Sequence, residues 1–407
     1  MDGPTIKGAL TGAFTAFPGY DMRMHSMAEE FDDASSAPRR IALPVALPVR
    51  GRGAAENPAN RFEHSYHAPN PDAEDPRDHV DDDGAGDGAR AAPTQFLPDH
   101  SRSIIARNDS PDVGFTYSLN AYRGCEHGCI YCYARPTHET LGFSAGLDFE
   151  SRILVKHNAP DLLRHELSAA RWKPAVIAMS GVTDCYQPVE RKLQLTRRCL
   201  ETLRDFYNPT VIITKNHLVT RDIDILADMA RKNAAAVMVS ITTLRDDLAR
   251  IMEPRTSRPQ RRFEAVRALA SAGVPVGVMV APVIPALTDE EMPDILAAAG
   301  QAGAMYAGYT LVRLPLAVAP LFDDWLARHM PDRREKILNR IRAMREGRLN
   351  DADFGRRMTG QGVFAEQLRQ VFALSCRRAG IGDRFPEPSA GAFRAPGRAV
   401  QMGLFGQ

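Results

Sequence analysis

The sequence has no long apolar run, no strong net charge and few cysteines. No stretch approaches the roughly 18 uninterrupted apolar residues that a membrane-spanning helix needs, so we expect no membrane association. Six cysteines in 407 residues are too few for a disulfide framework. The formal net charge of +1 excludes an overall basic character, so any nucleic-acid-binding surface must be local. The first ten residues carry Asp2 and no basic segment followed by a long apolar one, which argues against a secretory signal and predicts a cytoplasmic protein.

Sustained hydrophobic periodicity is also missing from residues 1–95. Between residues 71 and 90 there are eight carboxylates and only two arginines. Few aliphatic side chains are available there to offset the entropy of ordering, so we expect a mostly disordered N-terminal region. One basic island, residues 50–63 (RGRGAAENPANRFE), stands out without an evident role.

From residue 96 to residue 318 apolar strands alternate with amphipathic helices. Six strands are predicted at residues 115–120, 175–180, 210–214, 236–242, 276–283 and 304–311. Helices are predicted at residues 162–170, 190–206, 223–232, 261–272 and 288–300, the last with a capping box between Thr288 and Glu291. Strands this apolar are buried on both faces, as in a parallel sheet. The fold class is therefore α/β, a partial (β/α)6 TIM-type barrel, because six units are too few for an eight-fold barrel.

The C-terminal quarter contains helices without strands. We expect residues 319–381 to form a helical extension over the open side of the barrel, and residues 382–407 to form a flexible tail rich in Gly and Pro. One of these helices, residues 333–347, has a basic face made of Arg333, Arg334, Lys336, Arg340, Arg342 and Arg345. Such a face is commonly only solvated, but it is also where a duplex would be expected to touch.

Three cysteines follow the first predicted strand in a CxxxCxxC spacing. They are Cys125, Cys129 and Cys132, with Tyr131 directly before the last. Soft thiolates select iron–sulfur clusters, zinc or copper(I). In a cube of four irons, three cysteines leave one iron for a small molecule. The alternative is a structural zinc site, in which His127 or His138 supplies the fourth ligand.

The spacing and its surrounding words resemble a known family. Residues 124–139 (GCEHGCIYCYARPTHE), 180–190 (SGVTDCYQPVE) and 213–216 (ITKN) resemble the radical S-adenosylmethionine (SAM) superfamily, in its spore photoproduct lyase-related, DNA-repair-photolyase-like branch. The resemblance implies a [4Fe–4S] cluster on the three cysteines and SAM on the free iron. One electron, from a donor such as flavodoxin or ferredoxin, then cleaves SAM to methionine and a 5′-deoxyadenosyl radical that takes a hydrogen atom from the substrate.

The resemblance also implies which residues bind SAM, at the C-terminal ends of the barrel strands. Gly181, Thr183 and Asp184 would contact the amino group of SAM, and Lys215 would contact its carboxylate. Ser240 and Thr242 would contact the ribose, and Tyr131 would contact the adenine. Each has an ordinary alternative. Gly181, Thr183 and Asp184 could simply form a turn, and Lys215 could be a solvated residue at a strand end. Ser240 and Thr242 could be ordinary strand residues, and Tyr131 could pack against the loop.

Two residues are candidates for donating a hydrogen atom to the product radical. Cys185 and Tyr186 follow the second strand, but in the lyase the donor cysteine precedes the acidic residue, whereas Cys185 follows Asp184. This departure weakens the case for photoproduct repair itself. The alternative for Cys185 is a buried thiol that packs as a small hydrophobe.

Local features suggest work on DNA. A cluster of Arg255, Arg258, Arg261 and Arg262 with Glu253 suits either phosphate contact or ion pairing across the barrel mouth. Near the end of the tail, Gln401, Leu404 and Phe405 resemble a peptide that binds the bacterial sliding clamp. The leading hypothesis is a lyase-like radical SAM enzyme for DNA repair or base modification. The alternatives are a radical SAM enzyme with a small-molecule or protein substrate, and a non-enzymatic metal-binding interaction module.

Overall fold

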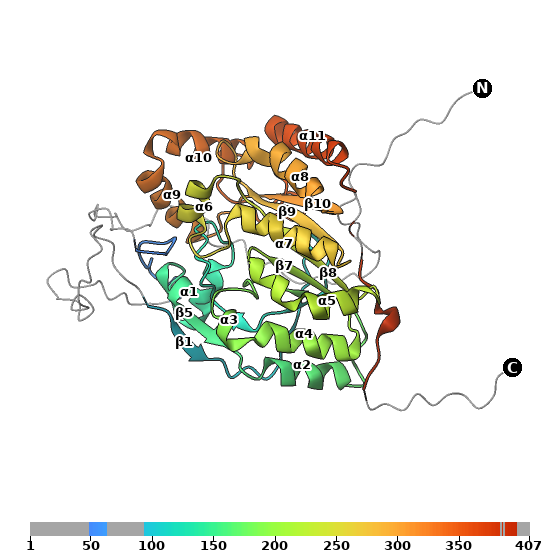
Figure 1. Cartoon of the computed structure of the whole chain (residues 1–407). Coiled ribbons are helices and arrows are strands. Elements are labelled where there is room, and N and C mark those ends of the chain that lie inside the picture. Colours follow the sequence, from blue (N-terminus) through green and yellow to red (C-terminus); the bar gives the residue numbers. More distant parts are fainter. Residues whose placement is uncertain (1–48, 63–92, 383–384, 386, 397–407) are drawn as a thin grey trace, which may run out of the picture.

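The main sheet carries the site. A computed structural model of the chain describes residues 49–62, 93–382, 385 and 387–396. In this part of the chain a seven-stranded sheet has the order β10-β9-β8-β7-β6-β3-β2 (Figure 1). Six of its strands are parallel neighbours: β3 (Tyr117–Leu119), β6 (Ile177–Met179), β7 (Thr210–Thr214), β8 (Ala235–Ser240), β9 (Val276–Val283) and β10 (Tyr306–Leu311). The short β2 (Ile105–Arg107) is antiparallel to β3 at one edge.

The predicted partial barrel is confirmed strand by strand, since each parallel strand lies within or overlaps a predicted range. All six residues of β8 are buried, and β7 and β9 are buried over most of their length. Burial on both faces explains the continuous apolar runs, because crossover helices cover the outer face. In Figure 1 those helices follow the order of the strands. They are α2 (Ala159–Ser168), α4 (Leu195–Phe206), α5 (Ile223–Ala230), α7 (Pro259–Ser271) and α8 (Met292–Gln301).

Two helix predictions need correction. The helix predicted over residues 190–206 is two helices, α3 (Glu190–Leu193) and α4, because Gln194 adopts a left-handed conformation with φ of 50°. The capping box predicted for Thr288 does not form. Its hydroxyl accepts from the Ile284 amide at 2.9 Å, and the Glu291 carboxylate accepts from Thr243 and Leu244. A 3-10 turn, η3 (Asp289–Glu291), therefore precedes α8.

A second, three-stranded sheet, in the order β1-β5-β4, was not predicted. Its strands are β1 (Gln95–Pro98), β4 (Tyr122–Arg123) and β5 (Arg152–Val155). They are too short for periodicity to identify. The antiparallel pair β4 and β5 brackets residues 124–151, which contain the three cysteines, η1 (Arg135–Leu141) and α1 (Leu147–Ser151). The small sheet thus fixes both ends of the cysteine loop.

Residues 49–62, which include most of the basic island noted in the sequence, are packed against the cysteine loop. The Glu150 carboxylate accepts from the Gly53 and Ala54 amides, each at 2.9 Å. The backbones approach so closely that a Cβ on Gly53 would lie 2.0 Å from the Gly128 carbonyl oxygen. The segment is held by backbone contacts, so its sequence shows no periodic apolar face.

The remaining helices lie at the strand ends and on the β10 side. Those at the strand ends are η2 (His217–Asp222) and α6 (Asp246–Met252). The C-terminal ones are α9 (Val318–His329), η4 (Pro331–Arg333), α10 (Arg334–Ala343) and α11 (Gly362–Arg378). The predicted helical extension is present: α11 packs against α8, and Tyr309 of β10 contacts Phe372 at 4.8 Å between ring centroids. In the described ranges every helix is too short or too polar to span a membrane.

The predicted flexible tail is packed over part of its length. In residues 387–396, which include η5 (Ala390–Ala392), the Arg394 amide donates to the Phe206 carbonyl at 2.8 Å. The rings of Phe393 and Phe206 are 6.1 Å apart between centroids. The residues predicted to bind a sliding clamp, Gln401, Leu404 and Phe405, lie outside the described residues.

Candidate functional site

The three cysteines lie on the loop that follows β3 and β4. Cys125 and Cys129 are buried, Cys132 is half-buried, and all three are free thiols. Backbone bonds shape the loop: the Cys125 amide donates to the Phe149 carbonyl at 2.9 Å, and the Cys132 amide to the Cys129 carbonyl at 3.2 Å. The loop is therefore held in place by the protein itself.

A buried ion pair behind the loop holds it in position. The Arg135 guanidinium and the Glu150 carboxylate are fully buried and lie 2.5 Å apart. Arg135 also donates to the backbone carbonyls of Cys129 and Gly128. Since Glu150 anchors Gly53 as well, one carboxylate joins the N-terminal segment to the cysteine loop. Breaking such a pair by removing one partner costs about 3–5 kcal/mol, so the loop has a rigid support.

The donor set fits an iron–sulfur cube. In a cube each cysteine ligates a different iron, so the thiols need not converge on one point. In the residues that the structure describes, no three His, Cys, Asp or Glu side chains are grouped to hold one metal ion. Burial raises the pKa of Cys125, and the charges of Asp184 and Cys129 raise it further. Cluster binding must therefore deprotonate these thiols and release protons.

The two histidines of the zinc alternative are already engaged. His127 Nδ1 lies 3.4 Å from the Asp184 carboxylate, and its Nε2 is 3.1 Å from the Asn216 amide nitrogen. The Nε2 atom of His138 is 2.9 Å from the Arg152 carbonyl oxygen, and burial lowers the pKa of His138 to about 4. This geometry gives the zinc alternative no support.

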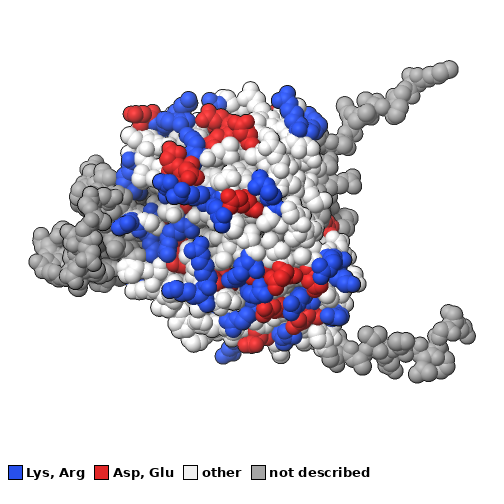
Figure 2. Space-filling view, in the orientation of Figure 1, with Lys and Arg blue, Asp and Glu red and all other residues white. Residues whose placement is uncertain are grey.

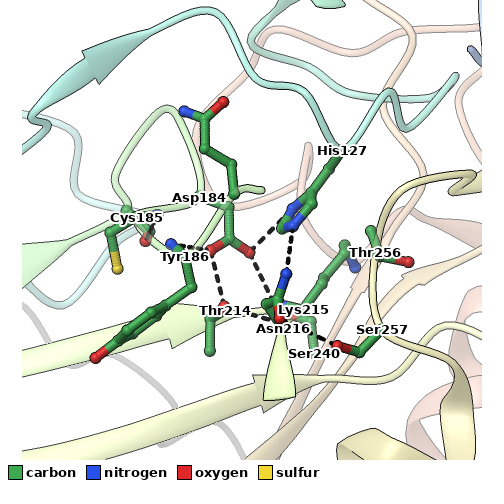
Figure 3. A network of polar contacts seen from close by, with 12 residues as sticks. His127, Asp184, Cys185, Tyr186, Thr214, Lys215, Asn216, Ser240, Thr256 and Ser257 are labelled. Atoms are coloured by element: carbon green, nitrogen blue, oxygen red, sulfur yellow. Dashed lines mark hydrogen bonds and ion pairs between the residues drawn. The ribbon is translucent and has the colours of Figure 1, made fainter. Parts of the chain in front are cut away.

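Asp184 is the centre of the polar network in Figure 3. Its carboxylate accepts from the Thr214 hydroxyl and the Lys215 amide, both at 2.7 Å, and from the Tyr186 amide at 2.9 Å. Burial alone would raise the pKa of Asp184, but His127 and these donors outweigh it and lower that pKa. Asp184 thus ties the cysteine loop to the end of β7. Its predicted contact with the amino group of SAM stays a prediction.

The two residues predicted beside Asp184 lie against the first strands. The Thr183 hydroxyl donates to the Tyr122 carbonyl at 3.0 Å. A Cβ on Gly181 would lie 3.0 Å from the Ser118 Cβ, and the Gly181 carbonyl accepts from the Tyr133 hydroxyl at 2.7 Å. The absence of a side chain at Gly181 therefore makes room for Ser118, and the predicted contact of Gly181 with SAM stays a prediction.

Lys215, Thr242 and Tyr131, which are far apart in the sequence, come together. The Lys215 ammonium donates to the Ala281 carbonyl at 2.8 Å and to the Thr242 hydroxyl at 3.2 Å, and lies 5.7 Å from the Tyr131 ring centroid. Its side chain is only 16% exposed, so it is not the solvated lysine of the alternative interpretation. Ser240 is buried nearby, and its carbonyl accepts from Arg262 at 3.0 Å.

Glu253 joins this group, a role that the sequence did not predict. It is fully buried, accepts from the hydroxyls of Thr242 and Tyr131, and pairs with Lys215 at 3.4 Å and with the buried Arg262. Burial opposes the charge, but Arg262 and Lys215 outweigh it and lower the pKa of Glu253. The sequence offered ion pairing between Glu253 and the arginine cluster as one alternative, and the pair with Arg262 is of that kind. It did not predict the contacts with Tyr131 and Lys215, which come from distant segments.

Cys185 and Tyr186, the predicted hydrogen-atom donors, lie in the main apolar core. Both are at most 3% exposed, and the Tyr186 hydroxyl donates to Asp222 at 3.1 Å. Figure 3 shows both side chains directed away from His127 and Lys215. Their role stays a prediction that this geometry does not support.

Tyr133 is a residue beside the cluster ligands that the sequence did not single out. It follows Cys132 directly and is 49% exposed.

Both predicted basic clusters lose a member to the interior. Arg262 is 1% exposed and forms the buried pair with Glu253, whereas Arg255, Arg258 and Arg261 remain at the surface. Arg345 lies beyond the end of α10, is 2% exposed and donates to the Val312 carbonyl at 2.7 Å. The basic face predicted for residues 333–347 therefore excludes Arg345.

Known proteins resemble this chain over the same region. An uncharacterised protein of Mycobacterium tuberculosis is 39% identical over 222 residues, which cover 54% of this chain and 65% of that relative. An uncharacterised protein of Methanocaldococcus jannaschii is 29% identical over 233 residues, covering 57% of this chain and 83% of the relative. Spore photoproduct lyase complexed with dinucleoside spore photoproduct superposes with a TM-score of 0.49 at 15% identity, over 72% of this chain and 81% of that one. So loose a superposition carries no argument about the substrate.

A match to a family model shows which part of the chain carries this resemblance. Residues 119–299 match the model of the radical SAM superfamily. The cofactors of that superfamily are a [4Fe–4S] cluster and SAM, for which the cysteine loop supplies a fitting donor set. The matched residues begin at the end of β3 and run through the cysteine loop to α8. Because they include every strand end at which the site is built, we conclude that residues 119–299 of this chain form a radical SAM domain.

Proposed function

We propose that this protein is a lyase-like radical SAM enzyme that generates a 5′-deoxyadenosyl radical. When bound, the [4Fe–4S] cluster supplies one electron to the sulfonium of SAM, which cleaves to methionine and that radical. The observation that carries the proposal is the supported loop with three free cysteines beside the buried group of Lys215, Thr242, Tyr131 and Glu253. The residues of this chain hold the cluster, orient SAM and exclude water.

Lys215 is the residue we assign to the carboxylate of SAM. Its ammonium is only 16% exposed and is partly balanced by Glu253 at 3.4 Å. Charge–charge attraction strengthens away from bulk water, so a carboxylate arriving here would be held firmly. Thr242 and Ser240 are assigned to the ribose, Tyr131 to the adenine, and Gly181, Thr183 and Asp184 to the amino group.

The cysteine assignment is tested by cluster content. We expect C129A to lose most of its iron and sulfide after anaerobic reconstitution, and to form no 5′-deoxyadenosine from SAM under reductant. The matched control is C376A, since Cys376 is a buried free thiol in α11, away from the loop. If C129A keeps the iron, sulfide and nucleoside yield of C376A, the proposal is wrong. A protein that binds a cluster without cleaving SAM would instead be a metal-binding module.

We further propose that the substrate is DNA, for repair or base modification. Support comes from the surface cations of α10 and from the clamp-like residues Gln401, Leu404 and Phe405 in the tail. Because we propose DNA as the substrate, we also propose that the enzyme acts in the cytoplasm. A small-molecule or protein substrate remains the competing proposal, and the salt dependence of duplex binding separates the two.

A further inference from the structure

A basic pocket lies on the outer side of the cysteine loop. It has a volume of about 540 Å³ and is built by loop and helix residues of the segments that follow β6, β7 and β8. Among the described residues, four arginines and no carboxylate line it: Arg191, Arg255, Arg258 and Arg261. Figure 2 shows basic side chains gathered on this face beside α7. The pocket is therefore shaped for a negatively charged partner.

The inner wall of the pocket touches the cysteine loop directly. Asn216, which lines the pocket, lies 3.1 Å from Nε2 of His127 through its amide nitrogen. The Arg255 amide donates to the His127 carbonyl at 3.2 Å, and its guanidinium pairs with Glu126 at 3.0 Å. Glu126 and His127 stand between Cys125 and Cys129 in the sequence. The pocket lining thus contacts two residues that lie between cluster ligands in the chain.

The pocket does not share the side chains proposed to bind SAM. The Lys215 ammonium points to Ala281, Thr242 and Glu253, and none of these lines the pocket. A partner seated here would therefore reach the cluster side of the loop without occupying the SAM site.

The positive charge of the pocket is available to a partner. Arg191 forms no ion pair with any carboxylate in the described ranges. Arg258 pairs with Asp246 at 3.4 Å and Arg261 with Glu264, and both arginine side chains are more than half exposed. Exposed pairs of this kind contribute about 0–1 kcal/mol, so they exchange readily for a partner's carboxylates.

We propose that this pocket is the docking site for an acidic one-electron donor protein of the flavodoxin or ferredoxin class. The inference rests on the proposed function, because a cluster that gives an electron to SAM must receive one from outside. In the transfer the donor loses one electron and the cluster gains it, and no bond forms or breaks. Complementary charge steers the encounter and orients the donor against the loop.

The test measures binding directly. Labelled flavodoxin is titrated with the full chain at low salt and its fluorescence anisotropy is recorded. We expect the double variant R191E/R258E to weaken binding at least tenfold and to reduce its salt dependence. The control is R231E, because Arg231 is a 69% exposed arginine that does not line the pocket. Equal affinities for the wild type and R191E/R258E, or no binding by the wild type, would overturn the proposal.

A second measurement separates this proposal from the proposed function. We expect R191E/R258E to form much less 5′-deoxyadenosine with reduced flavodoxin, and to match the wild type within about twofold with dithionite, which needs no docking site. If the wild type forms none even with dithionite, the proposed function fails whatever the binding result. If R191E/R258E loses affinity for duplex DNA but keeps its affinity for flavodoxin, the pocket is a phosphate site and the donor proposal is wrong.

Discussion

At the scale of single residues, buried charges determine how the site is held. Glu150 and Glu253 each accept hydrogen bonds from segments far away in the sequence, and each pairs with a buried arginine. Tyr131 and Glu253, for example, are 122 residues apart. The sequence identified the cysteines and Lys215, which stand in recognisable local motifs. It offered Glu253 only as one possible ion-pair partner of an arginine cluster and did not identify Glu150, because the partners of both glutamates are set by the fold.

His138 provides a test at the same scale. Burial in contact with Phe149 lowers its pKa to about 4, with Asp148 and Arg135 as the nearby charges. The folded state therefore binds fewer protons than the unfolded state between pH 4 and 6.5. The contribution of neutral His138 to the free energy of unfolding is complete above pH 6.5 and falls as the pH drops towards 4. The total loss is about 3 kcal/mol at 1.36 kcal/mol per pKa unit.

We expect H138Q, which keeps a donor near the Arg152 carbonyl, to lose less stability than the wild type between pH 7 and pH 4.5. Urea unfolding at the two pH values measures the difference, and effects shared by both proteins cancel. Identical pH dependence in the two proteins would contradict the buried, neutral state of His138.

At the scale of elements, the six parallel strands followed from sequence because short runs rich in apolar, aromatic and β-branched residues alternate with helical patterns. The small sheet, the Gln194 break and the packing of residues 49–62 did not. Strands β1 and β4 contain only four and two residues, too few for a pattern. Segment 49–62 is positioned by the Glu150 carboxylate and by the room that Gly53 leaves.

The docking of this segment can be tested with paired glycine variants. A Cβ on Gly53 would lie 2.0 Å from the Gly128 carbonyl oxygen, whereas Gly51, at φ of 69°, has no atom within 4 Å of such a Cβ. We expect G51A to cost about 1 kcal/mol of left-handed backbone strain. We expect G53A to cost about 3 kcal/mol, because the backbones must separate.

Urea unfolding measures both losses, and trypsin cleavage at Arg52 reports whether the segment has come away. Faster cleavage is expected in G53A only. Equal unfolding free energies and equal cleavage rates in the two variants would show that the segment does not depend on this contact.

At the scale of the whole molecule, a nearly neutral chain carries separate basic regions. One is the pocket beside the cysteine loop, and another is the surface of η4 and α10 with Arg333, Lys336 and Arg340. Two of these cations already have partners within the protein. Arg333 donates to the Ala286 carbonyl, and the guanidinium of Arg340 lies 3.5 Å from the centroid of the Phe364 ring. DNA binding through α10 must therefore rest on few cations.

Neutralising that surface tests the proposed substrate. We expect K336Q/R340Q to weaken binding to a short DNA duplex and to reduce the slope of log affinity against log salt by about 2, because each removed cation leaves one phosphate with its counterion. The double variant R171Q/R231Q, in exposed loops, removes the same charge elsewhere. An unchanged slope in K336Q/R340Q, or no binding by the wild type at low salt, would favour a small-molecule or protein substrate.

The sequence by itself determined the alternation of strands and helices, the cysteine loop and the family, because each depends on residues that are close together in the chain. Only the tertiary structure decided which charges are buried. It paired Arg262 with Glu253 and Arg135 with Glu150, and it placed the side chains of Cys185 and Tyr186 in the apolar core. Burial is a property of the packed strand ends rather than of any local pattern, and it determines whether a charged side chain supports the site or meets a partner.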